Sequence, residues 1–148
     1  MSDDDKFTLK NMLSLNKEYL ETCDTELAIG RKLKSCFNPG SVYLNEEAMT
    51  IMNDFFHRNI KNFDYYGRNI LSPKTVIKLR DNINEFKERL IVAESAEDFV
   101  GFMDDFYLNN LRYQFEDRKE LLISLADSLV NWLDEMIERK KFVTMYGP

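Results

Sequence analysis

The chain has 148 residues, of which 44% are hydrophobic and 31% charged, and its 26 acidic residues outnumber 20 basic ones to give a net charge of -6. This composition is typical of a globular domain and excludes an intrinsically disordered chain. The acidic balance argues against nucleic-acid binding, which needs an excess of Lys and Arg to contact phosphates. At this length we expect one domain over residues 1–148, in which residues 1–6 form a disordered acidic N-terminus.

Helical periodicity dominates the first half of the chain. Apolar residues recur at helical spacing from Leu9 to Leu27, which predicts a first helix. A turn follows over residues 38–41, where Pro and Gly stand side by side. Asn45 is then a suitable N-cap for a second helix, whose apolar stripe continues to Phe63.

Three more helical patterns follow. Ser72 and Pro73 predict a helix start, because Ser accepts hydrogen bonds from free N–H groups and Pro suits the first turn. Ser95 and Asp98 form a capping box that predicts a fourth helix. Its apolar and aromatic stripe comprises Phe99, Phe102, Met103, Phe106, Asn110 and Tyr113. A fifth helix is predicted over residues 122–141, and since no breaker separates it from the fourth, one long kinked helix is the alternative.

Only two short segments resemble strands, residues 41–44 and 142–146. Two such segments are too few for a stable sheet, and with 5 Gly and 3 Pro the chain has few turn residues for a many-stranded fold. The sequence therefore predicts an all-α fold, a compact bundle of four to six helices.

The residues that usually carry metals or catalysis are few. His57 is the only histidine and stands three residues after Asp54, as in half of a di-iron motif whose second half is missing. Cys23 and Cys36 are too few, even with His57, for a four-ligand zinc site. We expect no metal and no cofactor.

A catalytic site is not predicted either. Cys36 and His57 form the one conceivable nucleophile pair, but no glycine-rich oxyanion turn or strand-to-helix elbow accompanies them. Most acidic residues fall between the apolar positions of helices, where solvated side chains are expected rather than paired catalytic carboxylates. We expect that the chain is not an enzyme and has no catalytic residues.

The cellular location of the protein is predicted from the N-terminus, the hydropathy and the cysteines of the chain. The N-terminus is acidic and has no apolar core of a secretory signal. No run approaches the roughly 18 apolar residues of a membrane span. Because two cysteines are too few for a disulfide scaffold, both are expected to be reduced thiols. These features predict a cytoplasmic protein that does not enter a membrane.

The charge is concentrated in residues 96–117, which contain six acidic residues and one basic residue among six aromatic ones. One interpretation is a solvated helix face above an aromatic core, with acids near the N-terminus favoured by the helix dipole. The other is a protein-binding face, in which acids accelerate association with a basic partner and aromatic side chains anchor the complex. The second interpretation predicts these partner-binding residues: Asp98, Asp104, Asp105, Tyr107, Asn109, Arg112, Glu116 and Asp117.

A small, acidic, helical chain with an acidic aromatic stretch from Glu97 to Asp117 resembles the bacterial immunity proteins of contact-dependent growth inhibition and other polymorphic toxin systems. The resemblance implies one-to-one binding of a cognate toxin domain, often a nuclease, by a protein that is a monomer when free. Such a nuclease would be basic, and an acidic inhibitor would mimic the charge of its substrate.

The alternative function is that of a self-associating helical regulatory or scaffolding protein, including the phage-encoded kind. Self-association would use an exposed apolar seam, because like charges repel across a two-fold interface. Size-exclusion chromatography at high and low salt separates a monomeric binder from a stable dimer.

Overall fold

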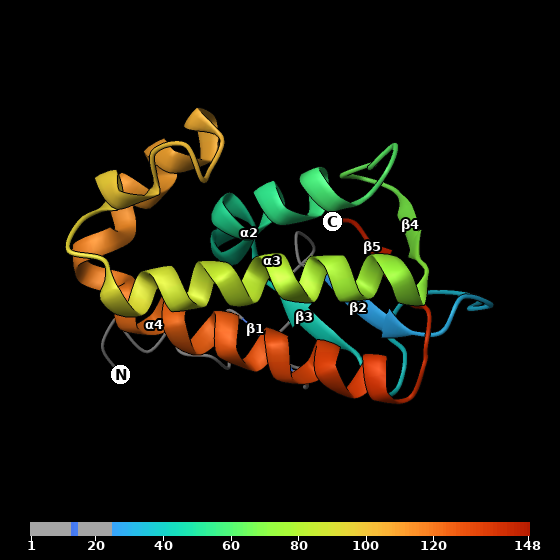
Figure 1. The fold of residues 1–148 in the computed structure, drawn as a ribbon. Helices are drawn as coiled ribbons and strands as arrows, with labels where there is room; N and C mark the ends of the chain where they lie inside the picture. The colour runs from blue at the N-terminus through green and yellow to red at the C-terminus, as the bar shows by residue number, and fades with distance from the viewer. Residues whose placement is uncertain (1–12, 15–24) are drawn as a thin grey trace, which may run out of the picture.

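The computed structural model describes residues 13–14 and 25–148, and these form an antiparallel sheet with helices packed on it. The predicted disordered N-terminus over residues 1–6 lies outside the described residues, as does most of the predicted first helix. Figure 1 shows the order of the elements along the chain and their arrangement in space.

The sheet brings together short strands from distant parts of the chain. Its strands are β1 (Leu13–Ser14), β2 (Thr25–Ile29), β3 (Val42–Leu44), β4 (Arg68–Leu71) and β5 (Val143–Tyr146). They are antiparallel in the order β1-β3-β2-β5-β4. The C-terminal strand β5 therefore lies between β2 and β4, with Met145 opposite both Leu27 and Asn69.

The predicted all-α bundle is wrong, because the chain is a mixed α/β protein. Leu27, expected in a helix, lies in β2, and both short segments that resembled strands are strands, β3 and β5. The strands that sequence reasoning missed are β1, β2 and β4. Leu13, like Leu27 expected in the first helix, lies in β1. Strands β2 and β4 are only five and four residues long and both pair with β5, more than 70 residues away, so local periodicity does not reveal them.

Two predicted helix starts are confirmed. Helix α2 (Glu46–Asn59) begins after Asn45, whose side chain accepts a hydrogen bond from the N–H of Ala48 at 2.9 Å. Helix α3 (Pro73–Val92) begins after Ser72, which accepts from the N–H of Thr75. In both cases a short polar side chain satisfies an N–H group that the first helical turn leaves free.

The capping box of Ser95 and Asp98 is present, but it caps a single 3-10 turn, η3 (Ala96–Phe99), rather than the predicted fourth helix. The predicted fourth and fifth helices are instead one 34-residue helix, α4 (Asp105–Glu138), which has Asp104 as its N-cap. Figure 1 shows that α4 bends partway along its length, so the alternative of one long kinked helix is correct.

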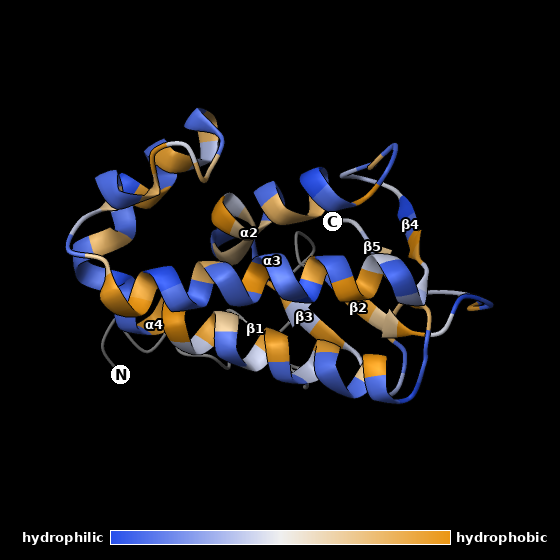
Figure 2. Cartoon of the chain, viewed as in Figure 1, coloured by the Kyte–Doolittle hydropathy of each residue, from blue (hydrophilic) through white to orange (hydrophobic). Residues whose placement is uncertain are grey.

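Helices α3 and α4 run side by side in opposite directions, in front of the sheet (Figure 1). Figure 2 shows that both alternate between hydrophilic and hydrophobic residues, as expected for helices with one face on a core. The largest fully buried side chains between the layers are Phe55, Phe56, Phe86, Phe99, Leu27, Leu44, Ile51, Met52, Leu71, Leu79 and Ile83. No helix in the described part of the chain is long and apolar enough to span a membrane.

The connection between α3 and α4 forms an arm that extends from the helical layer at the end away from β4 (Figure 1). We define the arm as residues 94–117, which include η3 and the first turns of α4. Rings at its base pack against the helices: Phe99 lies 5.5 Å from Phe86, and Phe102 lies 6.2 Å from Phe55, between ring centroids. This aromatic cluster fixes the base of the arm to α2 and α3.

Candidate functional site

The arm exposes one side of α4 to solvent. Its apolar residues Leu108, Leu111 and Phe115 are buried on one side of the helix. A helix turns 100° per residue, so the residues between them project to the opposite side. We call this side the acidic aromatic face, and it comprises Asp105, Phe106, Asn109, Tyr113, Glu116 and Asp117, all of which are exposed.

Two large rings stand in the open on this face. Tyr113 is 93% exposed and Phe106 is 69% exposed, whereas Phe99 and Phe115, on the same arm, are buried. The ring of Phe106 meets that of Tyr107 edge-on, with 5.1 Å between centroids. Exposed rings that are seven residues apart on one helix form an apolar strip along its surface, of the kind that anchors protein partners.

The negative charge of the face is offset only in part within the described part of the chain, where the charge of Arg112 interacts with that of Asp105. No ion pair there involves Asp105, Glu116 or Asp117. Arg112, the one basic residue of the arm, donates two hydrogen bonds to the Glu97 carboxylate, at 2.6 and 3.0 Å. This contact lowers the pKa of Glu97. The guanidinium is thus bound at the border of the face, and three carboxylates stay available to a partner.

Two of the residues predicted to bind a partner, Asp98 and Asp104, stabilise the arm itself. Asp98 accepts hydrogen bonds from the N–H groups of Glu94 and Ser95, which lower its pKa. Asp104 is the N-cap of α4 and accepts from the N–H of Phe106 at 2.9 Å. Both remain exposed, but each already stabilises a helical turn of the arm.

Tyr107, also predicted to bind the partner, lies on the opposite side of α4 and contacts α2. Its hydroxyl accepts a hydrogen bond from Asn53 at 2.7 Å, and burial raises its pKa. Asn110 and Gln114 continue this row by donating to the carbonyl and the hydroxyl of Thr50. Tyr107 therefore holds the arm against α2. Of the predicted residues, Asp105, Asn109, Glu116 and Asp117 lie on the acidic aromatic face, with Arg112 at its border.

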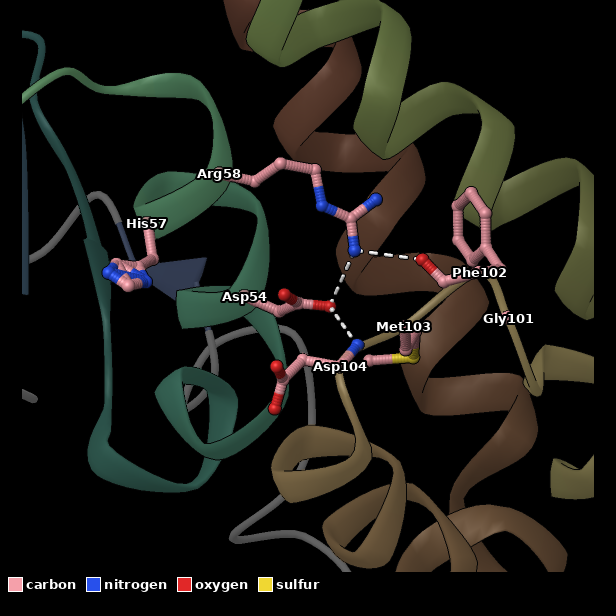
Figure 3. Close-up of a pocket in the computed structure, with 7 residues that line it drawn as sticks. All are labelled: Asp54, His57, Arg58, Gly101, Phe102, Met103 and Asp104. Atoms are coloured by element: carbon pink, nitrogen blue, oxygen red, sulfur yellow. Dashed lines mark hydrogen bonds and ion pairs between the residues drawn. The ribbon is translucent and has the colours of Figure 1, made fainter.

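An open pocket of about 530 Å³ lies where the arm meets α2 (Figure 3). The Asp54 carboxylate, only 5% exposed, accepts from Arg58 at 2.9 Å and from the N–H of Asp104 at 3.3 Å. Arg58 also donates to the carbonyl of Phe102 at 2.8 Å. Burial raises the pKa of Asp54, and the charge of Arg58 opposes that rise. This network connects α2 to the start of α4.

Asp54 and His57 both line the pocket, but they do not come together as metal ligands would. His57 points away from Asp54 in Figure 3, and its ring lies 6.2 Å from that of Phe63. No group of three or more metal-binding side chains occurs among the described residues. Both donors to Asp54 belong to the protein, so the carboxylate acts as a link between two segments.

Sequence reasoning also missed the role of Glu26, a carboxylate in β2 that is 3% exposed. It accepts hydrogen bonds from the backbone N–H groups of Phe37 and Asn38 and from the hydroxyl of Ser41 at 2.6 Å. These donors all belong to the connection between β2 and β3, so Glu26 shapes that loop. The neighbouring Cys36 is an exposed free thiol.

Phe106 and Tyr113 are the exposed aromatic residues that the predicted stripe placed on the core side. A helix that began at Ala96 would bury them, whereas α4 begins only at Asp105. A signal was available, because Leu108 and Leu111 continue through Phe115 at the same 3,4 spacing as residues 122–136. That longer pattern places both rings on the solvent side.

Comparisons with protein-family models, with curated proteins and with solved structures find no match to this chain. The function must therefore be argued from the exposed side chains of the arm and the contacts that hold them in place.

Proposed function

We propose that this chain is a cytoplasmic binding protein of the immunity type, which neutralises a basic toxin domain by one-to-one binding through the acidic aromatic face. The observation that carries this proposal is the exposure of Tyr113 and Phe106 beside three unpaired carboxylates on one side of α4. Binding requires no catalytic group or cofactor, in keeping with the expectation that the chain is not an enzyme.

The two kinds of side chain on the face support different stages of binding. Carboxylates attract a basic surface over about one Debye length and accelerate its encounter with the arm. Exposed Tyr and Phe rings lose contact with water in the complex and reduce its rate of dissociation. A nuclease toxin would meet the charge requirement, because its own substrate-binding surface must be basic.

The face is built on rigid elements, which lowers the entropy cost of binding. Its residues share one helix, and the base of the arm is fixed by the aromatic cluster and the contacts of Asp54 and Arg58. A backbone that is already ordered loses less conformational freedom when the partner arrives.

The proposal is tested by co-expressing the tagged chain with the product of its neighbouring gene, followed by affinity purification and mass spectrometry. We expect a basic protein at one-to-one stoichiometry that stops growth when expressed alone and is harmless together with the chain. Recovery of a neighbouring protein that is neither toxic nor basic would contradict the immunity function.

The face itself is tested by the triple variant Asp105→Asn, Glu116→Gln, Asp117→Asn. Stability should change by no more than about 0.5 kcal/mol, because these side chains are exposed and have no ion pairs. Affinity for the partner should fall, and its dependence on salt should weaken. The matched control is Glu88→Gln, Glu135→Gln, Glu138→Gln, which removes the same charge from exposed positions away from the arm. Equal affinity of both triple variants would show that the face is only a solvated surface.

Self-association remains the second candidate, and exposed apolar residues of α3 favour it. Val92 is 78% exposed, Ile91 is 55% exposed and Ile77 is 43% exposed. Size-exclusion chromatography with light scattering, at low and high salt, separates the two functions. A dimer that persists in high salt and dissociates in the variant Ile91→Ser would support self-association through α3.

A further inference from the structure

Tyr113 is followed by two carboxylates one helical turn further along the chain. A ring beside carboxylates favours one kind of basic side chain over another. Glu116 and Asp117 follow Tyr113 by three and four residues, so their side chains are its neighbours on the surface of α4. Side chains on a helix lean toward its N-terminus, so both carboxylates lie over the turn of α4 that carries Tyr113. The ring is 93% exposed, and its surface is accessible from solvent.

The chain already shows which side chain satisfies a ring and a carboxylate together. The Arg58 guanidinium lies 5.5 Å from the centroid of Phe102 while donating to the Asp54 carboxylate at 2.9 Å. Arg112 contacts both carboxylate oxygens of Glu97. A flat guanidinium stacks on a ring and still directs N–H groups outward in its plane, whereas an ammonium group has no flat surface and holds its hydration water more strongly.

We propose that the acidic aromatic face binds an arginine side chain of its basic partner, with the guanidinium stacked on Tyr113 and paired with Glu116 or Asp117. This inference rests on the proposed function and adds to it the chemistry of the partner's central contact. The positive charge of the partner complements the three unpaired carboxylates, and arginine is the basic side chain that also uses the ring. A lysine of the partner at the same place would pair with a carboxylate but would stack less well on the ring.

The test compares two labelled Gly-Ser peptides, one carrying arginines and the other carrying lysines at the same positions. Each is titrated with the full chain at low ionic strength, and binding is followed by fluorescence anisotropy. We expect the arginine peptide to bind about three- to fivefold more tightly, which is the range for stacking of a cation on an exposed ring. Tyr113→Leu should reduce the affinity for the arginine peptide to that for the lysine peptide, whereas Tyr113→Phe should retain the preference.

Tyr66 provides the matched control, because it is 78% exposed and is followed by Asn69 and Ile70, rather than by acids, three and four residues later. The nearby Asp64 carboxylate already accepts a hydrogen bond from the backbone N–H of Tyr66. Tyr66→Leu should leave both affinities unchanged. Circular dichroism should show the same helix content in all variants, since both tyrosines are exposed. Equal binding of the two peptides, or a preference that survives Tyr113→Leu, would overturn the inference. The proposed function would then still stand if the co-expressed toxin binds the chain and the triple variant lowers the affinity of that binding.

Discussion

Asp54 and its partner Arg58 connect α2 to the arm through hydrogen bonds to the backbone of the arm. The carboxylate accepts from the Arg58 guanidinium and from the N–H of Asp104, and Arg58 continues to the carbonyl of Phe102. Tyr107 lies close enough for the charge of Asp54 to raise its pKa. One buried carboxylate thus holds the backbone at the start of α4, from which the acidic aromatic face extends.

The raised pKa of Asp54 predicts a pH dependence of stability. The folded protein binds this proton more tightly than the unfolded chain, so the contribution of Asp54 to the free energy of unfolding falls as the pH rises through the ordinary Asp range toward the raised value. Asp54→Asn should remove this dependence. Urea unfolding between about pH 4 and pH 7 should therefore show the stability of wild type declining relative to that of the variant.

Asp117→Asn is the control for this experiment, because Asp117 is exposed and unpaired in the described part of the chain. It separates the effect specific to Asp54 from that of replacing any one carboxylate with an amide. A constant difference between Asp54→Asn and wild type would show that Asp54 has the same proton affinity in the folded and unfolded chain.

At the scale of elements, the start of α4 decides which residues of the arm are available for binding. Had the capping box of Ser95 and Asp98 started a helix that continued to Tyr113, the predicted stripe would have faced the core. The helix instead ends after one 3-10 turn, and Asp104 begins a new one in a different rotational position. The starts of α2 and α3 were predictable because Asn45 and Ser72 act through local hydrogen bonds.

The role of Asp104 as N-cap predicts the effect of its replacement. Asp104→Ala removes the acceptor for the N–H of Phe106 and should lower the free energy of unfolding by about 1 kcal/mol. Asp104→Ser keeps a capping oxygen and should lower the free energy of unfolding by only a few tenths of 1 kcal/mol. Urea denaturation of both variants measures the difference. Equal stability of the two variants would show that the cap contributes nothing.

At the scale of the whole molecule, the C-terminal part of α4 connects the helices to the sheet. Trp132 is 8% exposed, and its indole N–H donates to the carbonyl of Gly40 at 3.0 Å, in the connection between β2 and β3. Strand β5, which follows α4, occupies the middle of the sheet. The last third of the chain thus covers and completes a sheet whose other described strands all come from the first half.

Trp132 therefore supports a prediction for the stability of the entire fold. Trp132→Ala should lower the free energy of unfolding by about 3–5 kcal/mol, because it leaves a cavity and an unpaired carbonyl. Trp132→Phe fills most of the space and loses the hydrogen bond, so it should cost about 1 kcal/mol through that loss. Thermal unfolding monitored by circular dichroism measures both effects. A loss below about 1 kcal/mol for Trp132→Ala would contradict its role between the layers.

The sequence by itself determined the features that depend on neighbours along the chain. Asn45, Ser72 and Ser95 indicated helix starts because capping acts within one turn, and the acidic stretch over residues 96–117 was evident from its composition. Asp105, Asn109, Glu116 and Asp117, four of the residues predicted to bind a partner, are exposed on the acidic aromatic face, and their role in binding stays a prediction.

Only the tertiary structure decided the sheet and the side on which each aromatic residue of the arm lies. Strand β2 pairs with β5 across more than 110 residues, as Glu26 with Tyr146 shows, so no local pattern reveals this pairing. Tyr113 is exposed and Phe115 is buried because α2, α3 and η3 cover one side of α4 and leave the other in solvent. Burial is a property of the packed layers, and periodicity predicts it only when the start of the helix is known.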